Sequence, residues 1–136
     1  MSGESGDDFI IQMDREMSKK SFQYFFVDIL GFLFSDHHQS WKDGLEESQY
    51  YCVKASRDHG KSVFFMSYAL WIAAFNPGKH VMIFSHSLEQ TLEHMRFIKS
   101  NIDRIDCLRD MVPEGRPWAK SYFELSNGSR IMAKSV

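Results

Sequence analysis

The segment from Ala55 to Ser62 constrains the fold most, because it reads Ala-Ser-Arg-Asp-His-Gly-Lys-Ser between two regular patterns. The apolar run over residues 50–53 before it predicts a buried strand, and the pattern from Val63 to Phe75 after it predicts a helix. A strand, a tight turn containing Gly-Lys-Ser and a helix together wrap backbone N–H groups around the phosphates of a nucleotide. We therefore predict a phosphate-binding loop of the Walker A (P-loop) type here.

The end of this loop carries the chemistry that suits a nucleotide. Gly60 lets the backbone approach an anion where a side chain would obstruct it. Lys61 offers a compact positive charge to the β- and γ-phosphates, and the hydroxyl of Ser62 suits Mg²⁺, which prefers oxygen ligands. The general pattern begins with glycine, whereas this loop begins with Ala55, which fits if the backbone keeps a negative φ. The alternative is a plain surface turn at the start of a helix.

The middle of the loop is expected to act mainly through its backbone. Ser56 begins this part of the loop, and residues 57–62, including His59, supply cradling N–H groups that need no particular side chain. The guanidinium of Arg57 can contact the γ-phosphate or sense hydrolysis, or it can be a solvated loop arginine. A carboxylate repels a triphosphate, so we expect Asp58 to point away or to pair with Arg57.

Further candidates lie outside the loop. His38 can hydrogen-bond adenine, with Trp41 packed nearby, or both can be buried structural residues. Ser85 and His86 follow the next predicted strand, at the carboxyl end where α/β proteins gather their ligand sites. A helix-capping turn explains them equally well.

The remaining pattern predicts an α/β fold, because strands and helices alternate along the chain. Parallel strands with right-handed crossovers follow from that alternation. Ser87 can cap a helix with Gln90 as its capping-box partner, and Asn127-Gly128 is a strong hairpin signal. The predicted elements are a helix with one break over 9–34, helices over 38–47, 61–75 and 88–105, and strands over 50–55, 80–84, 120–125 and 129–133.

Composition adds limits on the class of protein. The 136 residues, 43% hydrophobic and 25% charged, fit one globular domain, and the net charge of −2 gives no global basic field for nucleic acid. Two cysteines, Cys52 and Cys107, favour a reduced, cytosolic setting over a disulfide framework, and the six histidines show no metal-binding spacing. The apolar stretch Phe22 to Phe34 is too short to span a bilayer and predicts a buried or docking helix.

No apolar strand ends in the paired acidic residues with which phosphate-loop ATPases hold the metal and activate water. The sequence runs out at Val136, within or just after a predicted strand. We therefore expect a fragment that stops before the acidic strand and is inactive alone.

The run from His37 to Val136 resembles the amino-terminal half of the ATPase domain in the large terminase subunit of tailed bacteriophages. Members of that family commonly have an arginine early in the phosphate loop and no first glycine, as in Ser56-Arg57-Asp58-His59-Gly60-Lys61-Ser62. Phe84-Ser85-His86-Ser87 followed by Gln90 is similar to the segment that couples nucleotide state to motion. Leu125 to Ile131 resembles the family's hairpin before the acidic strand, and His38 and Trp41 lie where the family places its adenine-side motif.

The resemblance implies a DNA-packaging motor in which hydrolysis of ATP with Mg²⁺ drives double-stranded DNA into a capsid in the host cell cytoplasm. It implies contacts with a portal and a small terminase subunit, assembly of several copies on the capsid, and a nuclease domain that this sequence lacks. Lys61 and Arg57 would be catalytic, residues 56–62 and His38 would bind ATP, and Ser62 would hold the metal. The domains would be a disordered tail over 1–8, a helical segment over 9–48 and a partial P-loop ATPase core over 49–136.

Two alternative functions stay open. A helicase-like or other phosphate-loop NTPase shares the loop, the strand and the hairpin region. A non-catalytic module would use the loop only to bind an anion or to turn, and its amino-terminal helices would dock a partner protein.

Overall fold

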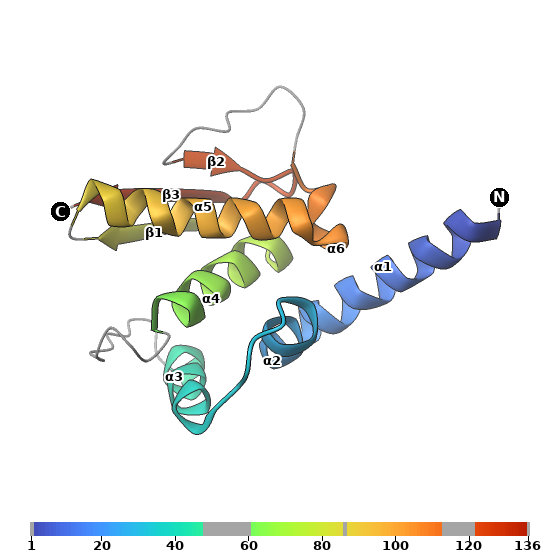
Figure 1. Cartoon of the computed structure of the whole chain (residues 1–136), viewed down its shortest axis with the longest axis horizontal. Helices are drawn as coiled ribbons and strands as arrows, with labels where there is room; N and C mark the ends of the chain where they lie inside the picture. Colours follow the sequence, from blue (N-terminus) through green and yellow to red (C-terminus); the bar gives the residue numbers. More distant parts are fainter. Residues whose placement is uncertain (1, 48–60, 86, 113–121, 136) are drawn as a thin grey trace.

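The computed structural model describes residues 2–47, 61–85, 87–112 and 122–135, and the predicted strand over 50–55 lies outside them. A small sheet lies beside the long helix α5, and the amino-terminal helices follow one another along the opposite side of α4 (Figure 1). The elements are α1 (Ser2–Lys20), α2 (Phe22–Tyr24), the π-helical turn η1 (Phe25–Ile29), α3 (Asp36–Glu47), α4 (Lys61–Phe75), β1 (His80–Ser85), α5 (Leu88–Arg104), α6 (Asp106–Arg109), β2 (Tyr122–Glu124) and β3 (Arg130–Ser135).

The described sheet has the order β1-β3-β2 and is mixed. β1 pairs with β3 in parallel, with His80 opposite Arg130 and Ser85 opposite Ser135. β2 pairs with β3 in antiparallel fashion around the turn that Asn127-Gly128 predicts. The predicted strand at 80–84, the hairpin and the α/β class are thereby confirmed.

The strands bury one set of alternating side chains, as period-two packing requires. Ile83, Phe123 and Ile131 are buried beneath the helices, whereas Met82 and Phe84 are 52% and 61% exposed. One face of the described sheet therefore packs on the core, and the other carries exposed apolar side chains on β1.

Helix α5 follows its predicted course. The Oγ of Ser87 accepts a hydrogen bond from the backbone N–H of Gln90 at 3.1 Å, so the predicted N-cap is confirmed. The apolar side chains of Met95, Ile98 and Ile102 are buried, but Leu88 in the first turn is 62% exposed. The buried face therefore begins after the first turn of the helix.

Helix α4 forms the centre of the core. Phe64, Leu70 and Ala73 have no exposed surface, and the helix is apolar on nearly every side. Its side chains are apolar all round because α4 is contacted by α1, by α5 and by β1. None of the helices in the described ranges is both long and apolar enough to cross a membrane.

The amino-terminal segment is helical from Ser2 to Ile29 with the predicted break, but the predicted helix over 9–34 is wrong at its end, because residues 30–35 are not helical. The break lies at Ser21, whose Oγ accepts a hydrogen bond from the N–H of Tyr24 at 3.2 Å. Helix α1 begins at Ser2, so its range includes residues for which the sequence predicts a disordered tail. Phe22, Phe25 and Phe26 are buried, which confirms the prediction of burial for the first part of the stretch Phe22 to Phe34, whereas Leu33 is 88% exposed.

Candidate functional site

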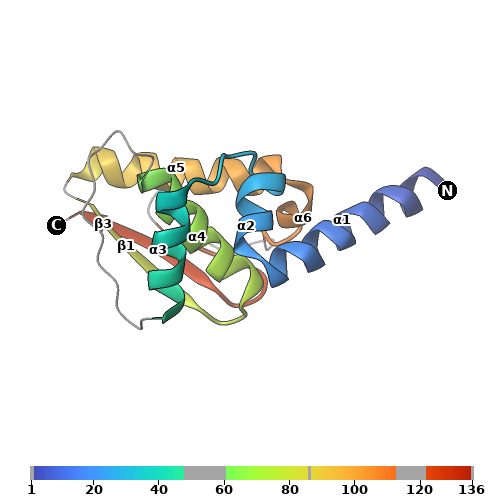
Figure 2. The same cartoon turned by 90° about the horizontal axis from the view of Figure 1, so that it is seen from below.

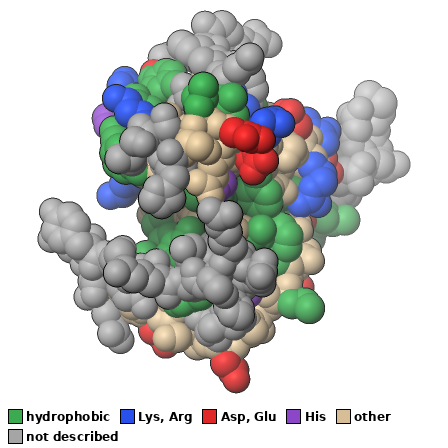
Figure 3. All heavy atoms as spheres, turned by 60° about the vertical axis from the view of Figure 1, so that its left-hand side comes forward, with side chains coloured by type: hydrophobic (Ala, Val, Ile, Leu, Met, Phe, Trp, Pro, Cys, Tyr) green, Lys and Arg blue, Asp and Glu red, His purple; other side chains and the backbone are tan. Residues whose placement is uncertain are grey.

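The ends of four elements, β1, β3, α4 and α5, lie at one end of the molecule. The parallel register aligns the carboxyl ends of β1 and β3, with Ser85 opposite Ser135. The amino-terminal ends of α4 and α5 lie at the same end, on the left of Figure 1, and Figure 2 shows the same arrangement from below. Figure 3 brings this end forward, and hydrophobic side chains gather in the middle of the view. Ligand sites in α/β proteins form at such an edge.

The structure describes only part of the predicted phosphate loop. Helix α4 begins at Lys61, with Ser62 second, which confirms that a helix follows the Gly-Lys-Ser turn. The first N–H groups of a helix have no intrahelical partner and carry the positive end of its dipole, so this terminus suits an anion. Residues 56–60 and His86 lie outside the described residues, as do the side chains of Lys61, Ser62 and Ser85. The phosphate-binding role of all of them stays a prediction.

His38, the predicted adenine-side residue, lies in α3 and is 8% exposed. Its ring stacks on Phe64 with centroids 5.1 Å apart and an angle of 9° between the planes. Its Nδ1 accepts a hydrogen bond from the backbone N–H of Ser35 at 3.2 Å. These are the contacts of a buried structural histidine, and they place His38 against the first turn of α4.

Phe64 is the centre of a larger aromatic cluster at the amino end of α4. Its ring meets Phe22 edge-on at 5.4 Å and Trp41 at 5.3 Å. Such edge-to-face pairs add to the free energy of burial and restrict the relative orientation of the elements that carry them. The aromatic cluster therefore holds α2 and α3 against the helix that follows the predicted loop. Its members are Phe22, Phe26, Phe34, His38, Trp41 and Phe64.

The carboxyl end of α4 is capped by a residue that the sequence marks only as part of a turn. The Nδ2 of Asn127 donates to the carbonyl oxygens of Ala73 and Ala74 at 2.9 and 3.1 Å. Carbonyls in the last turn of a helix lack intrahelical donors, so this side chain satisfies groups that would otherwise be unpaired. Sequence reasoning missed this role, because the only signal was an Asn-Gly turn far along the chain.

Ser129 completes the connection between the hairpin and α4. Its side chain is fully buried, and its Oγ donates to the carbonyl of Asn76 at 2.9 Å. The same oxygen accepts the backbone N–H of Lys79 at 3.1 Å. The Asn-Gly-Ser turn thus joins the end of α4, the start of β1 and the start of β3.

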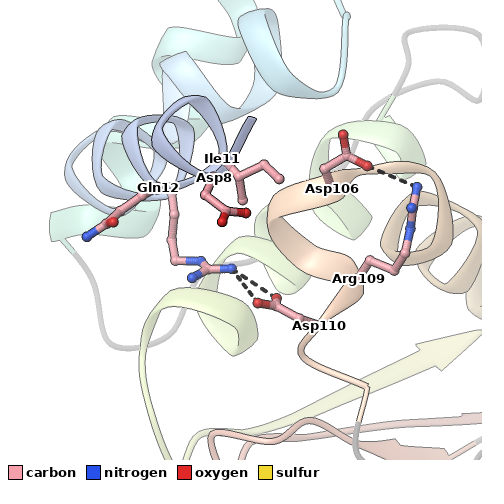
Figure 4. Close-up of a pocket in the computed structure, with 7 residues that line it drawn as sticks. Asp8, Ile11, Gln12, Asp106, Arg109 and Asp110 are labelled. Atoms are coloured by element: carbon pink, nitrogen blue, oxygen red, sulfur yellow. Dashed lines mark hydrogen bonds and ion pairs between the residues drawn. The ribbon is translucent and has the colours of Figure 1, made fainter. Parts of the chain in front are cut away.

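A separate cavity of about 560 Å³ lies between α1 and α6, at the other end of the molecule from the amino terminus of α4 (Figures 1 and 4). Arg15 forms two hydrogen bonds with the carboxylate of Asp110 at 2.9 and 2.8 Å. Arg109 pairs with Asp106 at 3.0 Å. Both arginines that line this cavity are therefore ion-paired, so it offers little excess positive charge to a triphosphate.

Burial shifts the pKa of several titratable groups in the described residues outside the loop, including Cys107 and His94. Burial raises the pKa of the Cys107 thiol to about 11, so this cysteine is protonated at neutral pH and a poor nucleophile. Burial also lowers the pKa of His94. In the described ranges, no three His, Cys, Asp or Glu side chains are grouped to hold a metal ion.

No protein-family model matches the chain, and no curated protein matches it either.

Proposed function

We propose that this chain is the ATP-binding part of a DNA-packaging ATPase of the large terminase type. One observation supports it most: the helix after the Gly-Lys-Ser turn opens at Lys61, at the end of the molecule where the parallel strands β1 and β3 finish. A phosphate-binding loop requires this combination of helix start and strand ends. The resemblance from His37 to Val136 supplies the particular type of ATPase.

In this proposal the loop binds the triphosphate, and each of its residues has a different role. Lys61 places a positive charge at the β- and γ-phosphates, and the N–H groups of residues 56–62 surround their oxygens. Arg57 stabilises the charge that develops on the γ-phosphate during transfer. Catalysis of phosphoryl transfer consists mostly of such positioning and charge stabilisation, so these groups suit the reaction.

The residues present fit Mg²⁺ in a limited way. Ser62 is the second residue of α4, where its hydroxyl can be one oxygen ligand to the ion. Mg²⁺ usually keeps several waters and takes further oxygens from the phosphates of the nucleotide. The ion would then reduce the negative charge on the phosphates, while Ser62 fixes its position relative to the loop.

The wider role of the protein rests on the resemblance alone. Hydrolysis of ATP would move double-stranded DNA into a capsid in the host cell cytoplasm, with several copies assembled at a portal. A small terminase subunit would be a further partner, and a nuclease domain would cut the DNA. His38 is proposed on the same ground as the adenine-side residue.

Titration of the chain with a non-hydrolysable ATP analogue and Mg²⁺ tests the proposal directly. We expect Lys61→Ala to weaken binding by about tenfold or more, because the phosphates lose a direct charge partner. Lys79→Ala is the matched control, since Lys79 is an exposed lysine between the carboxyl end of α4 and the start of β1, and so away from the amino end of α4. Equal affinities for both variants would contradict the phosphate loop, and no binding of the unmodified chain at millimolar nucleotide would favour a non-catalytic module.

A further inference from the structure

Helix α1 is fixed to the body at its last turn. Ser18 is fully buried, and its carbonyl oxygen accepts a hydrogen bond from the Nε1 of Trp71 at 2.6 Å. Trp71 belongs to α4, so this contact joins α1 to the centre of the core. The helix projects from the body with its amino terminus outermost (Figures 1 and 2). The last turn is therefore the fixed end of α1, and the rest of the helix depends on the contacts made before it.

Polar contacts hold the middle of α1. The Nη2 of Arg15 donates to both carboxylate oxygens of Asp110 at 2.9 and 2.8 Å (Figure 4) and to the carbonyl of Cys107 at 3.3 Å. The hydroxyl of Tyr24 donates to the carboxylate of Asp14 at 3.0 Å. The side chains of Arg15 and Asp110 are 32% and 65% exposed, so water and salt weaken their ion pair. Each of these contacts is weak by itself.

The packing beneath the middle of α1 is incomplete. Besides the cavity of about 560 Å³ between α1 and α6, a second cavity of about 220 Å³ lies between α1, η1 and α6. Among the described residues, the Nε of Arg15 and the Oγ of Ser18 are buried polar atoms without a hydrogen-bond partner. Cavities forfeit packing contacts, and buried polar atoms without partners cost free energy. Both effects reduce the free energy that holds the middle of α1 to the body.

The first part of α1 adds little stability of its own. Gly3 and Gly6 lie within its first two turns, and glycine is among the residues least favourable to a helix. Phe9 is 69% exposed and Met13 is 47% exposed, so these large apolar side chains bury only part of their surface. Segments with few buried contacts open more readily than the core does. The part of α1 before its last turn has the features of such a segment.

Cys107 lies beneath this part of α1. Its side chain is 2% exposed, and it lines the second cavity together with Ile10, Ile11 and Asp14 of α1. When α1 moves away, the thiol becomes accessible, and its pKa falls because burial is the main cause of the raised value. The reactivity of Cys107 therefore reports the position of α1.

We propose that residues 2–17 of α1 form an arm that opens reversibly away from α6, with the ion pair between Arg15 and Asp110 as its latch and Ser18 as its fixed end. The closed arm covers Cys107 and the apolar residues around it. The open arm uncovers that surface while α4, α5 and the sheet stay folded. The opening does not depend on nucleotide binding. Loss of one exposed ion pair shifts the equilibrium between the two states by a factor of a few.

Hydrogen exchange and thiol labelling of the full chain test the latch. We expect Asp110→Asn to accelerate amide exchange in residues 9–17, and labelling of Cys107 by N-ethylmaleimide, by about two- to fivefold, because both rates follow the open fraction. Asp106→Asn is the matched control. Asp106 is a similarly exposed aspartate (64%) that lines the same two cavities, but it pairs with Arg109 of its own helix.

The amides of α4 distinguish opening of the arm from unfolding of the whole chain. They should exchange at one slow rate in the unmodified chain and in both variants, because the core stays folded when the arm opens. Peptide mass spectrometry follows each helix separately and separates Cys107 from Cys52. Three results would overturn the proposal: unchanged rates in Asp110→Asn, an equal acceleration by Asp106→Asn, or faster exchange in α4 together with that in α1.

Discussion

The two ends of helix α4 are held in place by different kinds of interaction. At the amino end, Phe64 packs in the aromatic cluster contributed by α2 and α3. At the carboxyl end, Asn127 and Ser129 form directed hydrogen bonds to the last turn and the residues after it. Edge-to-face aromatic packing restricts the relative orientation of whole elements, whereas hydrogen bonds fix the position of individual backbone groups. Burial of aromatic rings therefore orients the amino end of α4, near the predicted loop. Hydrogen bonds set the register of its carboxyl end against the sheet.

Truncation at the amino end should have the largest effect on stability. Phe64→Ala removes a fully buried ring that contacts several other aromatic side chains, so we expect a loss of about 3–5 kcal/mol in the free energy of unfolding. Urea unfolding measures it. Phe84→Ala is the control, because Phe84 is 61% exposed and should cost much less. Similar costs for both variants would mean that the aromatic cluster does not hold the amino end.

Removal of the cap should have a smaller effect at the carboxyl end. Asn127→Ala leaves the carbonyls of Ala73 and Ala74 without their side-chain donor, so we expect a loss of about 1–2 kcal/mol. Ser126→Ala is the control, since Ser126 is exposed and its backbone N–H, which donates to the carbonyl of Met111, is unchanged by the substitution. Asn127→Asp keeps the acceptor for the backbone N–H of Ser129 but offers no donor to those carbonyls, so it should remain less stable than the unmodified chain. Full stability in Asn127→Asp would rule out this capping role.

Substitution of His38 should have the smallest effect on stability. It also tests whether His38, at the amino end of α4, contacts adenine or only packs in the aromatic cluster. His38→Phe keeps a ring against Phe64 but loses the acceptor for the N–H of Ser35, so we expect a loss of about 1 kcal/mol. Comparing the affinities for ATP and inorganic tripolyphosphate then tests the adenine contact. A selective loss of ATP affinity would establish that contact, and equal affinities in variant and unmodified chain would leave His38 a packing residue.

Several features of the fold could be predicted because their causes lie within a few residues. The Ser87 cap involves an N–H three residues later, and the Asn-Gly hairpin is set by its own turn. Helix α4 was predictable from its apolar run and from Asn76-Pro77-Gly78, a sequence that ends helices. Gly78 has a φ of +73°, a value that favours glycine. The start of α4 at Lys61 is the part of the candidate site that the sequence predicts and the structure confirms.

Other features could not be predicted because they depend on residues far apart in the chain. Ile10, Met13 and Met17 have the three- and four-residue spacing of a buried helix face. They are nevertheless 45% to 53% exposed, because the opposite side of α1 is the one that faces the body. Periodicity shows that a helix has an apolar face but cannot show whether a partner covers it. Likewise, the surroundings of His38 depend on Phe64, which belongs to a different helix.

By itself, then, the sequence determined the local elements, the turn chemistry and the candidate loop, because spacing and side-chain type control these over short distances. Tertiary structure alone decided that Asn127 caps a helix 54 residues earlier, that the described strands take the order β1-β3-β2, and that one stripe of α1 remains exposed. The physical reason is the same in each case. Pairing of distant groups depends on how whole elements pack together, and no local propensity encodes that arrangement.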